Sequence, residues 1–131
     1  MGDPLSIAVS GLTAASLRLN AAADNIANNQ DTAPTTPQPG APKPYQPVDV
    51  VQTPVPGGGT LATFHQVHPA SNTMYDPGSP FADQNGNVLA PNTDLAQQLV
   101  NTNIASVSYD ANVKVVQAQQ HMNGYLLNIF S

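Results

Sequence analysis

The chain has 131 residues and no cysteine, and only 8% of its residues are Asp, Glu, Lys or Arg. Three basic residues, Arg18, Lys43 and Lys114, are too few for the phosphate-binding surface of a nucleic-acid partner. Ordinary soluble domains carry roughly 25% charged residues, so a helical chain this poor in charge is a candidate for burial among protein neighbours.

The first predicted element is a helix over residues 4–29. Asp3 is suited to cap this helix, and Pro4 is suited to its first position. The helix is predicted to end at about Asn28 or Asn29, where the sequence becomes rich in Asn and Gln. Asp3 and the polar interruptions of its apolar face indicate a mature amphipathic helix and no cleaved signal peptide. Apolar residues recur in it at heptad spacing, and we call this set the N-terminal stripe: Ala8, Leu12, Ala15, Leu19, Ala22 and Ile26.

The middle of the chain is rich in proline and glycine. From Pro34 to Pro56 eight of 23 residues are proline, which excludes a helix. Val48–Gln52 and Thr60–Val67 are predicted to pair as a hairpin across Gly57-Gly58-Gly59, and residues 68–91 to form ordered loop with at most a short hairpin.

The last predicted element is a helix starting at Pro91-Asn92-Thr93-Asp94 and running to about residue 130. Its first C-terminal stripe is Val100, Ile104, Val107, Ala111, Val115, Ala118, Met122, Tyr125 and Ile129. Its second C-terminal stripe is Leu95, Leu99, Thr102, Ser106, Tyr109, Val113 and Val116. A helix with two contact lines needs two neighbours, so the helices are expected to complete their packing in other subunits.

These elements predict an α+β fold, with the terminal helices pairing as a coiled-coil-like layer and a small β-hairpin and loop region between them. The expected divisions are residues 1–30, 31–91 and 92–131. Assembly contacts are expected at the N-terminal stripe and, on the C-terminal helix, at Leu95, Leu99, Val100, Ile104, Val107, Tyr109, Ala111, Val113, Val115, Val116, Met122 and Ile129.

No catalytic constellation emerges from the sequence. His65 and His68 are three apart on a predicted strand, where they point to opposite faces and lack a completing ligand. Gly57-Gly58-Gly59 is not followed by the Lys-Ser/Thr of a phosphate loop. His121 is expected to pack or to form a hydrogen bond. We therefore expect neither an enzyme nor a metal, cofactor or small-molecule substrate.

Several stretches resemble the axial proteins of the bacterial flagellar rod and hook. At the N-terminus these are Ser10-Gly11-Leu12-Thr13-Ala14, Arg18-Leu19-Asn20 and Asn25-Ile26-Ala27-Asn28. Downstream, Val48-Asp49-Val50-Val51-Gln52, Tyr75-Asp76-Pro77-Gly78-Ser79-Pro80-Phe81-Ala82-Asp83, Pro91-Asn92-Thr93-Asp94-Leu95 and Ser108-Tyr109-Asp110-Ala111-Asn112-Val113 resemble proximal-rod subunits of the FlgC type. The similarity covers nearly the whole chain.

That resemblance implies a structural subunit whose terminal helices form an inner rod domain, with residues 31–91 outside it. It implies torque transmission around a central export channel, and type III export to the basal-body rod in the periplasmic space without a cleaved signal peptide. The implied partners are copies of the chain, other rod subunits, membrane-ring and rod-adaptor proteins, and the export apparatus in transit. The implied motif residues are Asn20, Asn25, Ile26, Ala27 and Asn28.

Two features depart from the family pattern, and three alternatives stay open. Residues 33–47 are unusually rich in proline, and Asn, Gln, Ala and Ser replace charged residues on the helices, so few salt bridges between subunits are expected. The alternatives are another axial rod or hook component, a soluble export adaptor and, remotely, a metal-dependent enzyme using His65 and His68.

Overall fold

The chain folds into two long helices and two β-hairpins. The computed structural model describes residues 3–36 and 39–129, with side chains as far as Leu126. In chain order the elements are α1 (Pro4–Ala27), β1 (Val48–Pro54), β2 (Thr60–Gln66), β3 (Ser71–Tyr75), β4 (Asn87–Pro91) and α2 (Leu95–Ile129). The predicted α+β class is confirmed.

The ends of α1 follow from its capping residues. Asp3 accepts a hydrogen bond from the backbone N–H of Leu5 at 3.2 Å, and Pro4 occupies the first turn, where its missing N–H costs nothing. At the other end Asn28 donates from Nδ2 to the carbonyl of Asp24 at 2.8 Å. The predicted start is confirmed, and the helix ends at Ala27, one or two residues before the predicted end.

Helix α2 begins at Leu95 because Asp94 caps it. The Asp94 carboxylate accepts from the backbone N–H of Ala96 at 2.9 Å and of Gln97 at 3.4 Å. The helix has 35 residues, and α1 has 24. At about 1.5 Å per residue α2 is therefore longer than α1 by roughly three turns.

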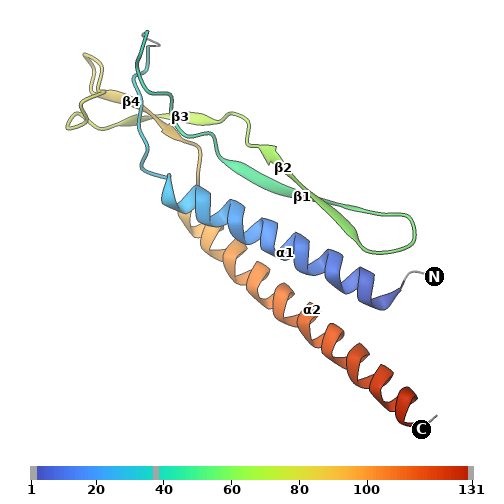
Figure 1. The fold of residues 1–131 in the computed structure, drawn as a ribbon. Coiled ribbons are helices and arrows are strands. Elements are labelled where there is room, and N and C mark those ends of the chain that lie inside the picture. Colours follow the sequence, from blue (N-terminus) through green and yellow to red (C-terminus); the bar gives the residue numbers. More distant parts are fainter. Residues whose placement is uncertain (1–2, 37–38, 130–131) are drawn as a thin grey trace.

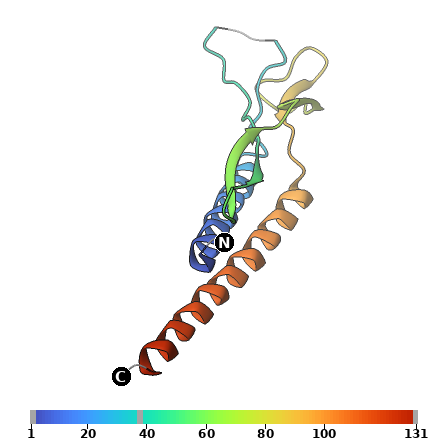
Figure 2. The same cartoon turned by 90° about the vertical axis from the view of Figure 1, so that its right-hand side faces the viewer.

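The two helices run antiparallel and side by side, with both chain termini at the same end (Figures 1 and 2). The extra length of α2 projects past the start of α1, and every residue from Gln120 to Leu126 is exposed. The predicted helix pairing is thus present, whereas supercoiled knobs-into-holes geometry stays a prediction.

The first hairpin forms as predicted and lies along α1 (Figure 1). Val48 pairs with Gln66 at its base and Pro54 with Thr60 near its tip, in antiparallel register. The loop between them contains Gly57, Gly58 and Gly59, all at positive φ, a region that glycine adopts without steric cost.

The second hairpin lies within residues 68–91, where the sequence predicts ordered loop with at most a short hairpin. Strand β3 pairs with β4, and an isolated bridge joins Ala33 to Leu89. In its connecting loop the Asp83 carboxylate accepts from the backbone N–H of Asn87 at 2.9 Å and of Asn85 at 2.8 Å. The bond from Asn87 is the main reason that the pKa of Asp83 lies below its usual value.

The buried core consists almost entirely of small side chains. Apart from Val88, Pro47 and Pro91, every buried apolar residue in the described part of the chain is alanine: Ala8, Ala14, Ala15, Ala21, Ala22, Ala33, Ala90 and Ala105. Large apolar side chains on both helices stay exposed instead. No described helix is long and apolar enough to span a membrane. The fold thus joins its elements by close backbone approach and leaves its bulkier apolar side chains uncovered.

Candidate assembly surfaces and the junction that orients them

Helices α1 and α2 approach each other closely at Gly11. A Cβ added there would lie 2.6 Å from the side-chain oxygen of Asn112, so no larger residue fits without movement. Asn112 is itself held in place, because its Nδ2 donates to the carbonyl of Ser108 at 2.8 Å. Gly11 therefore sets how near the two helices can lie.

The N-terminal stripe is largely covered within the chain. Ala8, Ala15 and Ala22 are buried, and Leu12 and Ile26 are half-buried. Leu19 keeps 41% of its surface exposed and borders a groove shared with Ala105 and Tyr109 of α2. Much of the N-terminal stripe is thus occupied by contacts inside this chain, and Leu19 is its most exposed member.

The face of α2 that meets α1 is polar and small, not apolar. Gln98 and Ala105 are buried, and Asn112 lies against Gly11. These residues follow one another at intervals of seven. The sequence pattern did not predict this face, because only apolar side chains were expected to mark a helix contact. Close approach of the two helices instead requires small or amide side chains here.

The first C-terminal stripe faces away from α1. Exposed fractions are 52% for Val100, 46% for Ile104 and 63% for Val107, and the stripe stays exposed to Tyr125. Val100, Ile104 and Val107 border a shallow groove of about 350 Å³. The remaining described members are also exposed: Ala111, Val115, Ala118 and Met122. The side chain of Ile129 lies outside the described ones.

The second C-terminal stripe is divided. Thr102, Val113 and Val116 are half-buried, beside the face that meets α1. Leu95, Leu99, Ser106 and Tyr109 are exposed. Within the described residues α2 therefore carries more apolar surface than α1 and the hairpins cover.

Asn25 joins four parts of the molecule. Its side chain is fully buried, and Nδ2 donates to the carbonyl of Val48 at 2.8 Å and to Oε1 of Gln98 at 3.2 Å. Its Oδ1 accepts from the N–H of Val48 at 3.1 Å and from the hydroxyl of Tyr45 at 3.1 Å. Both donors and both acceptor positions of the amide are used, so α1, α2, β1 and the preceding loop are held in one arrangement.

Tyr45 is tied to this junction at two points. Its backbone N–H donates to the carboxylate of Asp31 at 3.0 Å, and its hydroxyl donates to Asn25. Burial, and secondarily the charge of Asp24, raises the pKa of the Tyr45 hydroxyl. The neutral phenol that the hydrogen bond requires is therefore favoured.

The other motif residues lie at the same end of α1. Asn28 caps the helix, and Ile26 is half-buried. Asn20 and Ala27 are exposed. Of the predicted motif, Asn25 is the residue that the structure places at a contact between elements.

The tip of the first hairpin is fixed by Ser10. Its Oγ accepts from the backbone N–H of Thr60 at 3.1 Å and donates to the carbonyl of Ile7 at 2.7 Å. A Cβ on Gly59 would lie 2.6 Å from that oxygen, so glycine permits the close approach. Ser10 and Asn25, in opposite halves of α1, thus hold the hairpin against the helix.

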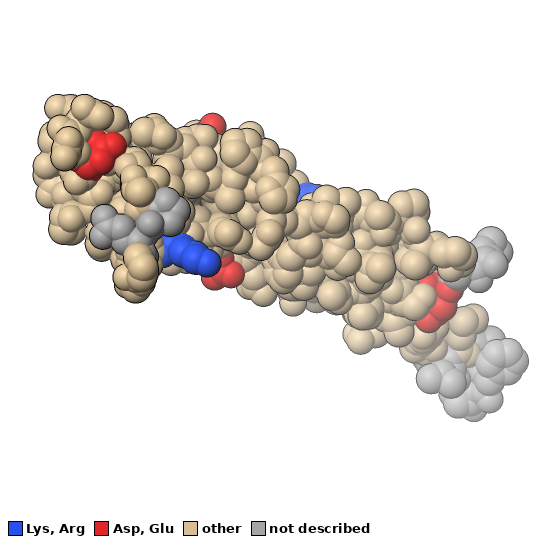
Figure 3. Space-filling model, turned by 90° about the horizontal axis from the view of Figure 1, so that it is seen from above, with Lys and Arg blue, Asp and Glu red and all other residues tan. Residues whose placement is uncertain are grey.

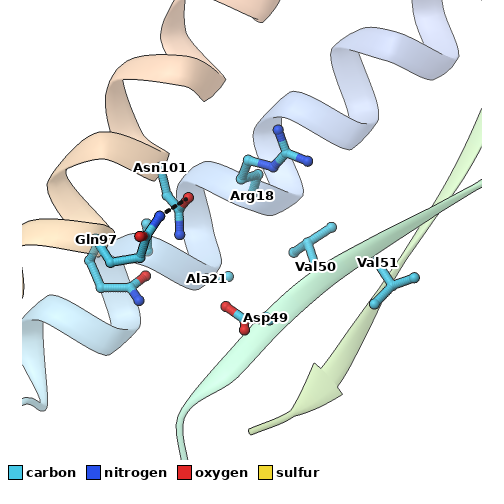
Figure 4. Close-up of a pocket in the computed structure, with 9 residues that line it drawn as sticks. Arg18, Ala21, Asp49, Val50, Val51, Gln97 and Asn101 are labelled. Atoms are coloured by element: carbon cyan, nitrogen blue, oxygen red, sulfur yellow. Dashed lines mark hydrogen bonds between the residues drawn. The ribbon is translucent and has the colours of Figure 1, made fainter. Parts of the chain in front are cut away.

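A pocket of about 480 Å³ lies where α1, β1 and α2 meet (Figure 4). Its lining combines a cation, an anion, amides and short apolar side chains, namely Arg18, Ala21, Ala22, Asp49, Val50, Val51, Gln97, Gln98 and Asn101. Gln97 donates from Nε2 to Oδ1 of Asn101 at 3.4 Å. Nothing in the sequence drew attention to this site.

The histidines do not form a metal site within the described residues. His65 and His68 are both exposed, and among the described residues no group of three or more His, Cys, Asp or Glu could hold a metal ion. His121 is exposed on the projecting part of α2, so the expectation that it packs was wrong. In the described part of the chain the arrangement offers contact surfaces and a pocket without a recognisable catalytic set.

Comparison with known proteins first defines a class. Residues 84–129, which include β4 and all of α2, match the family described as the C-terminal part of the flagellar basal body rod FlgEFG proteins. Together with the paired terminal helices, this match places the chain among the structural proteins of the flagellar rod.

Full-length relatives then define the family. The chain is 39% identical over 118 residues to the flagellar basal-body rod protein FlgC of Salmonella typhimurium, covering 88% of this chain and 87% of that one. It is 35% identical to FlgC of Agrobacterium fabrum over 130 residues, with the same coverage, and 31% identical to FlgC of Aquifex aeolicus, covering 86% and 84%. The chain belongs to the FlgC family of flagellar basal-body rod proteins, and it is a structural component of the flagellar basal body.

Proposed function

We propose that this chain is a proximal-rod subunit that assembles through the uncovered faces of its terminal helices. In this role the inner layer of helices surrounds the protein export channel and transmits motor torque. The subunit reaches the rod in the periplasmic space through the type III export apparatus. Its neighbours are copies of itself, other rod subunits and, at the base, membrane-ring and adaptor proteins.

The observation that carries the proposal is the exposed first C-terminal stripe. Val100, Ile104 and Val107 each leave about half or more of their surface in water, and the helix continues past α1 with no intramolecular cover from Gln120 to Leu126. A contiguous apolar face of this kind indicates a protein interaction site. The N-terminal stripe contributes mainly through Leu19, since its alanines are covered by the chain itself.

The main competing role is a soluble export adaptor. An adaptor would be a stable monomer or dimer in the cytoplasm and would be absent from purified basal bodies. A rod subunit is retained in them. Another axial rod or hook role is disfavoured, because the relatives that this chain matches over 87% of their length are FlgC proteins.

A substitution at the centre of the stripe tests the proposal. Val107→Asp places a charge where the isolated chain is 63% exposed, so its free energy of unfolding should change by no more than about 0.5 kcal/mol. In an assembled rod the same charge would be buried without a partner, which is costly. Cells relying on this variant should lack rods and should not swim.

The matched control is Val107→Leu, which keeps the position apolar and should support normal rods. Electron microscopy of basal bodies and a swimming assay provide the readouts. Normal rods built from Val107→Asp would show that this stripe is not an assembly face.

A further inference from the structure

The pocket between α1, β1 and α2 has an open strand edge along one side. Val48 uses both its N–H and its carbonyl on the Asn25 side chain, so these groups point away from β2. Because backbone polar groups alternate in direction along a strand, the N–H and carbonyl of Val50 point to the same side. Val50 lines the pocket, and no described hydrogen bond takes either group outside the hairpin.

The remaining lining can bind a peptide main chain. Asn101 and Gln97 offer amide donors and acceptors from α2, and Figure 4 shows them on the side of the pocket opposite the strand. An extended segment presents alternating donors and acceptors, which a free strand edge and side-chain amides can satisfy together. The volume of about 480 Å³ lies in the range of ordinary binding pockets.

The charge of Arg18 indicates which kind of extended segment the pocket would bind. Arg18 is half-buried and is one of only three Lys and Arg residues in the chain. All eight acidic residues are Asp. A partly desolvated guanidinium favours a carboxylate through charge-assisted hydrogen bonds. Asp49 lies on the strand side of the pocket, so the incoming carboxylate belongs on the α1 side, next to Arg18.

We propose that this pocket receives an extended segment of a neighbouring rod subunit, which adds as a strand to the β1 edge and places an acidic side chain on Arg18. The proposal rests on the role as a rod subunit and adds a contact separate from the helical layer. It also gives the first hairpin a third strand, and two-stranded hairpins are only marginally stable alone.

Photo-cross-linking in assembled basal bodies tests it. A photoreactive amino acid replaces Val51, which borders the pocket and is 43% exposed, or Val55, which is 40% exposed at the hairpin tip outside the pocket. Position 51 should cross-link to an extended segment with an acidic residue on another subunit, as mapped by mass spectrometry. Position 55 should not reach that segment.

Removing the charge should weaken the contact without unfolding the chain. Arg18→Gln should lower the cross-link yield at position 51 about tenfold, whereas Lys43→Gln, which changes a cation outside the pocket, should leave it unchanged. Circular dichroism of the purified variant checks that it folds. If Arg18→Gln does not fold, Val50→Pro removes the edge N–H, at a position where a strand tolerates proline, and should lower the yield similarly.

Three results would overturn the proposal in basal bodies that contain the chain: cross-links from position 51 only to helices, only within the same chain, or at unchanged yield in the folded charge variant. Absence of the unsubstituted chain from basal bodies would instead refute its role in the rod. The two failures are therefore distinguishable.

Discussion

Asn25 shows how one buried amide can set the arrangement of a whole subunit. It connects a strand, two helices and a loop that are distant in sequence, and it uses its full hydrogen-bonding capacity to do so. A leucine of similar size could fill the same space but would leave Val48 and Gln98 without partners. The asparagine therefore specifies the orientation of the hairpin, beyond any contribution to stability.

Asn25→Ala should lower the free energy of unfolding by about 2–4 kcal/mol, because it leaves several buried polar groups without partners. Asn20→Ala, at an exposed position of the same helix, should change it by no more than about 0.5 kcal/mol. Urea denaturation of the two purified variants provides the comparison. Equal effects would show that Asn25 is not the organising residue.

Tyr45 gives the junction a dependence on alkaline pH. Its pKa is raised in the folded chain, so the folded state holds the phenolic proton more tightly than the unfolded state. The resulting stability is present below the unfolded value of about 10 and is lost as the pH rises through the folded value. The advantage of the wild type over Tyr45→Phe should therefore shrink between about pH 8 and pH 11. Denaturation of both proteins at about pH 8 and about pH 11 measures this difference in the free energy of unfolding. A difference that does not change with pH would show that the Tyr45 hydroxyl is not the titrating group.

At the scale of elements, the helix pair depends on small residues and leaves larger ones free. Gly11 and the alanines allow α1 to lie close to α2 on one side and to the first hairpin on the other. The apolar side chains of α2 consequently remain available for other subunits. The same helix thus uses a polar and small-residue face within the chain and leaves an apolar face uncovered.

Gly11→Ala should destabilise the chain by about 1–3 kcal/mol, because the new Cβ overlaps the Asn112 side chain and forces the helices or that side chain to move. Gly124→Ala, where a Cβ would meet nothing within 4 Å, should instead stabilise α2 by up to about 1 kcal/mol. Thermal unfolding of both variants tests the contrast. Adding Asn112→Ala to Gly11→Ala should recover part of the lost stability. If none is recovered, the destabilisation does not come from overlap with the Asn112 side chain.

At the scale of the whole molecule, the surface is almost without charge. Figure 3 shows only a few acidic and basic side chains on the face in view, in keeping with three basic and eight acidic residues in the chain. Apart from the contact proposed at Arg18, we therefore expect subunits to be held together mainly by apolar packing and by amide hydrogen bonds. Neither is screened by salt in the way that ion pairs are.

Rods containing this chain should accordingly stay intact when the NaCl concentration rises from about 0.05 to 1 M, a range over which the screening length falls several-fold. Sedimentation and electron microscopy of purified basal bodies at both concentrations provide the measurement. Ready dissociation at the higher concentration would show that ion pairs hold the assembly.

Local patterns in the sequence determined the elements of this protein. Asp3, Pro4 and Asp94 fixed the helix starts, the glycine turn and alternating residues predicted the first hairpin, and the motifs around Asn25 and Tyr75 indicated the family. These features depend on backbone geometry and near neighbours, which a sequence displays directly.

Only the tertiary structure decided which faces are covered. It placed Gln98, Ala105 and Asn112 against α1, left Val100 and Val107 exposed, and brought Arg18 and Asp49 into one pocket. An apolar stripe predicts that a face will be covered but not by what. That choice depends on how closely two backbones can approach, and here Gly11 and the alanines favoured the smaller, more polar face.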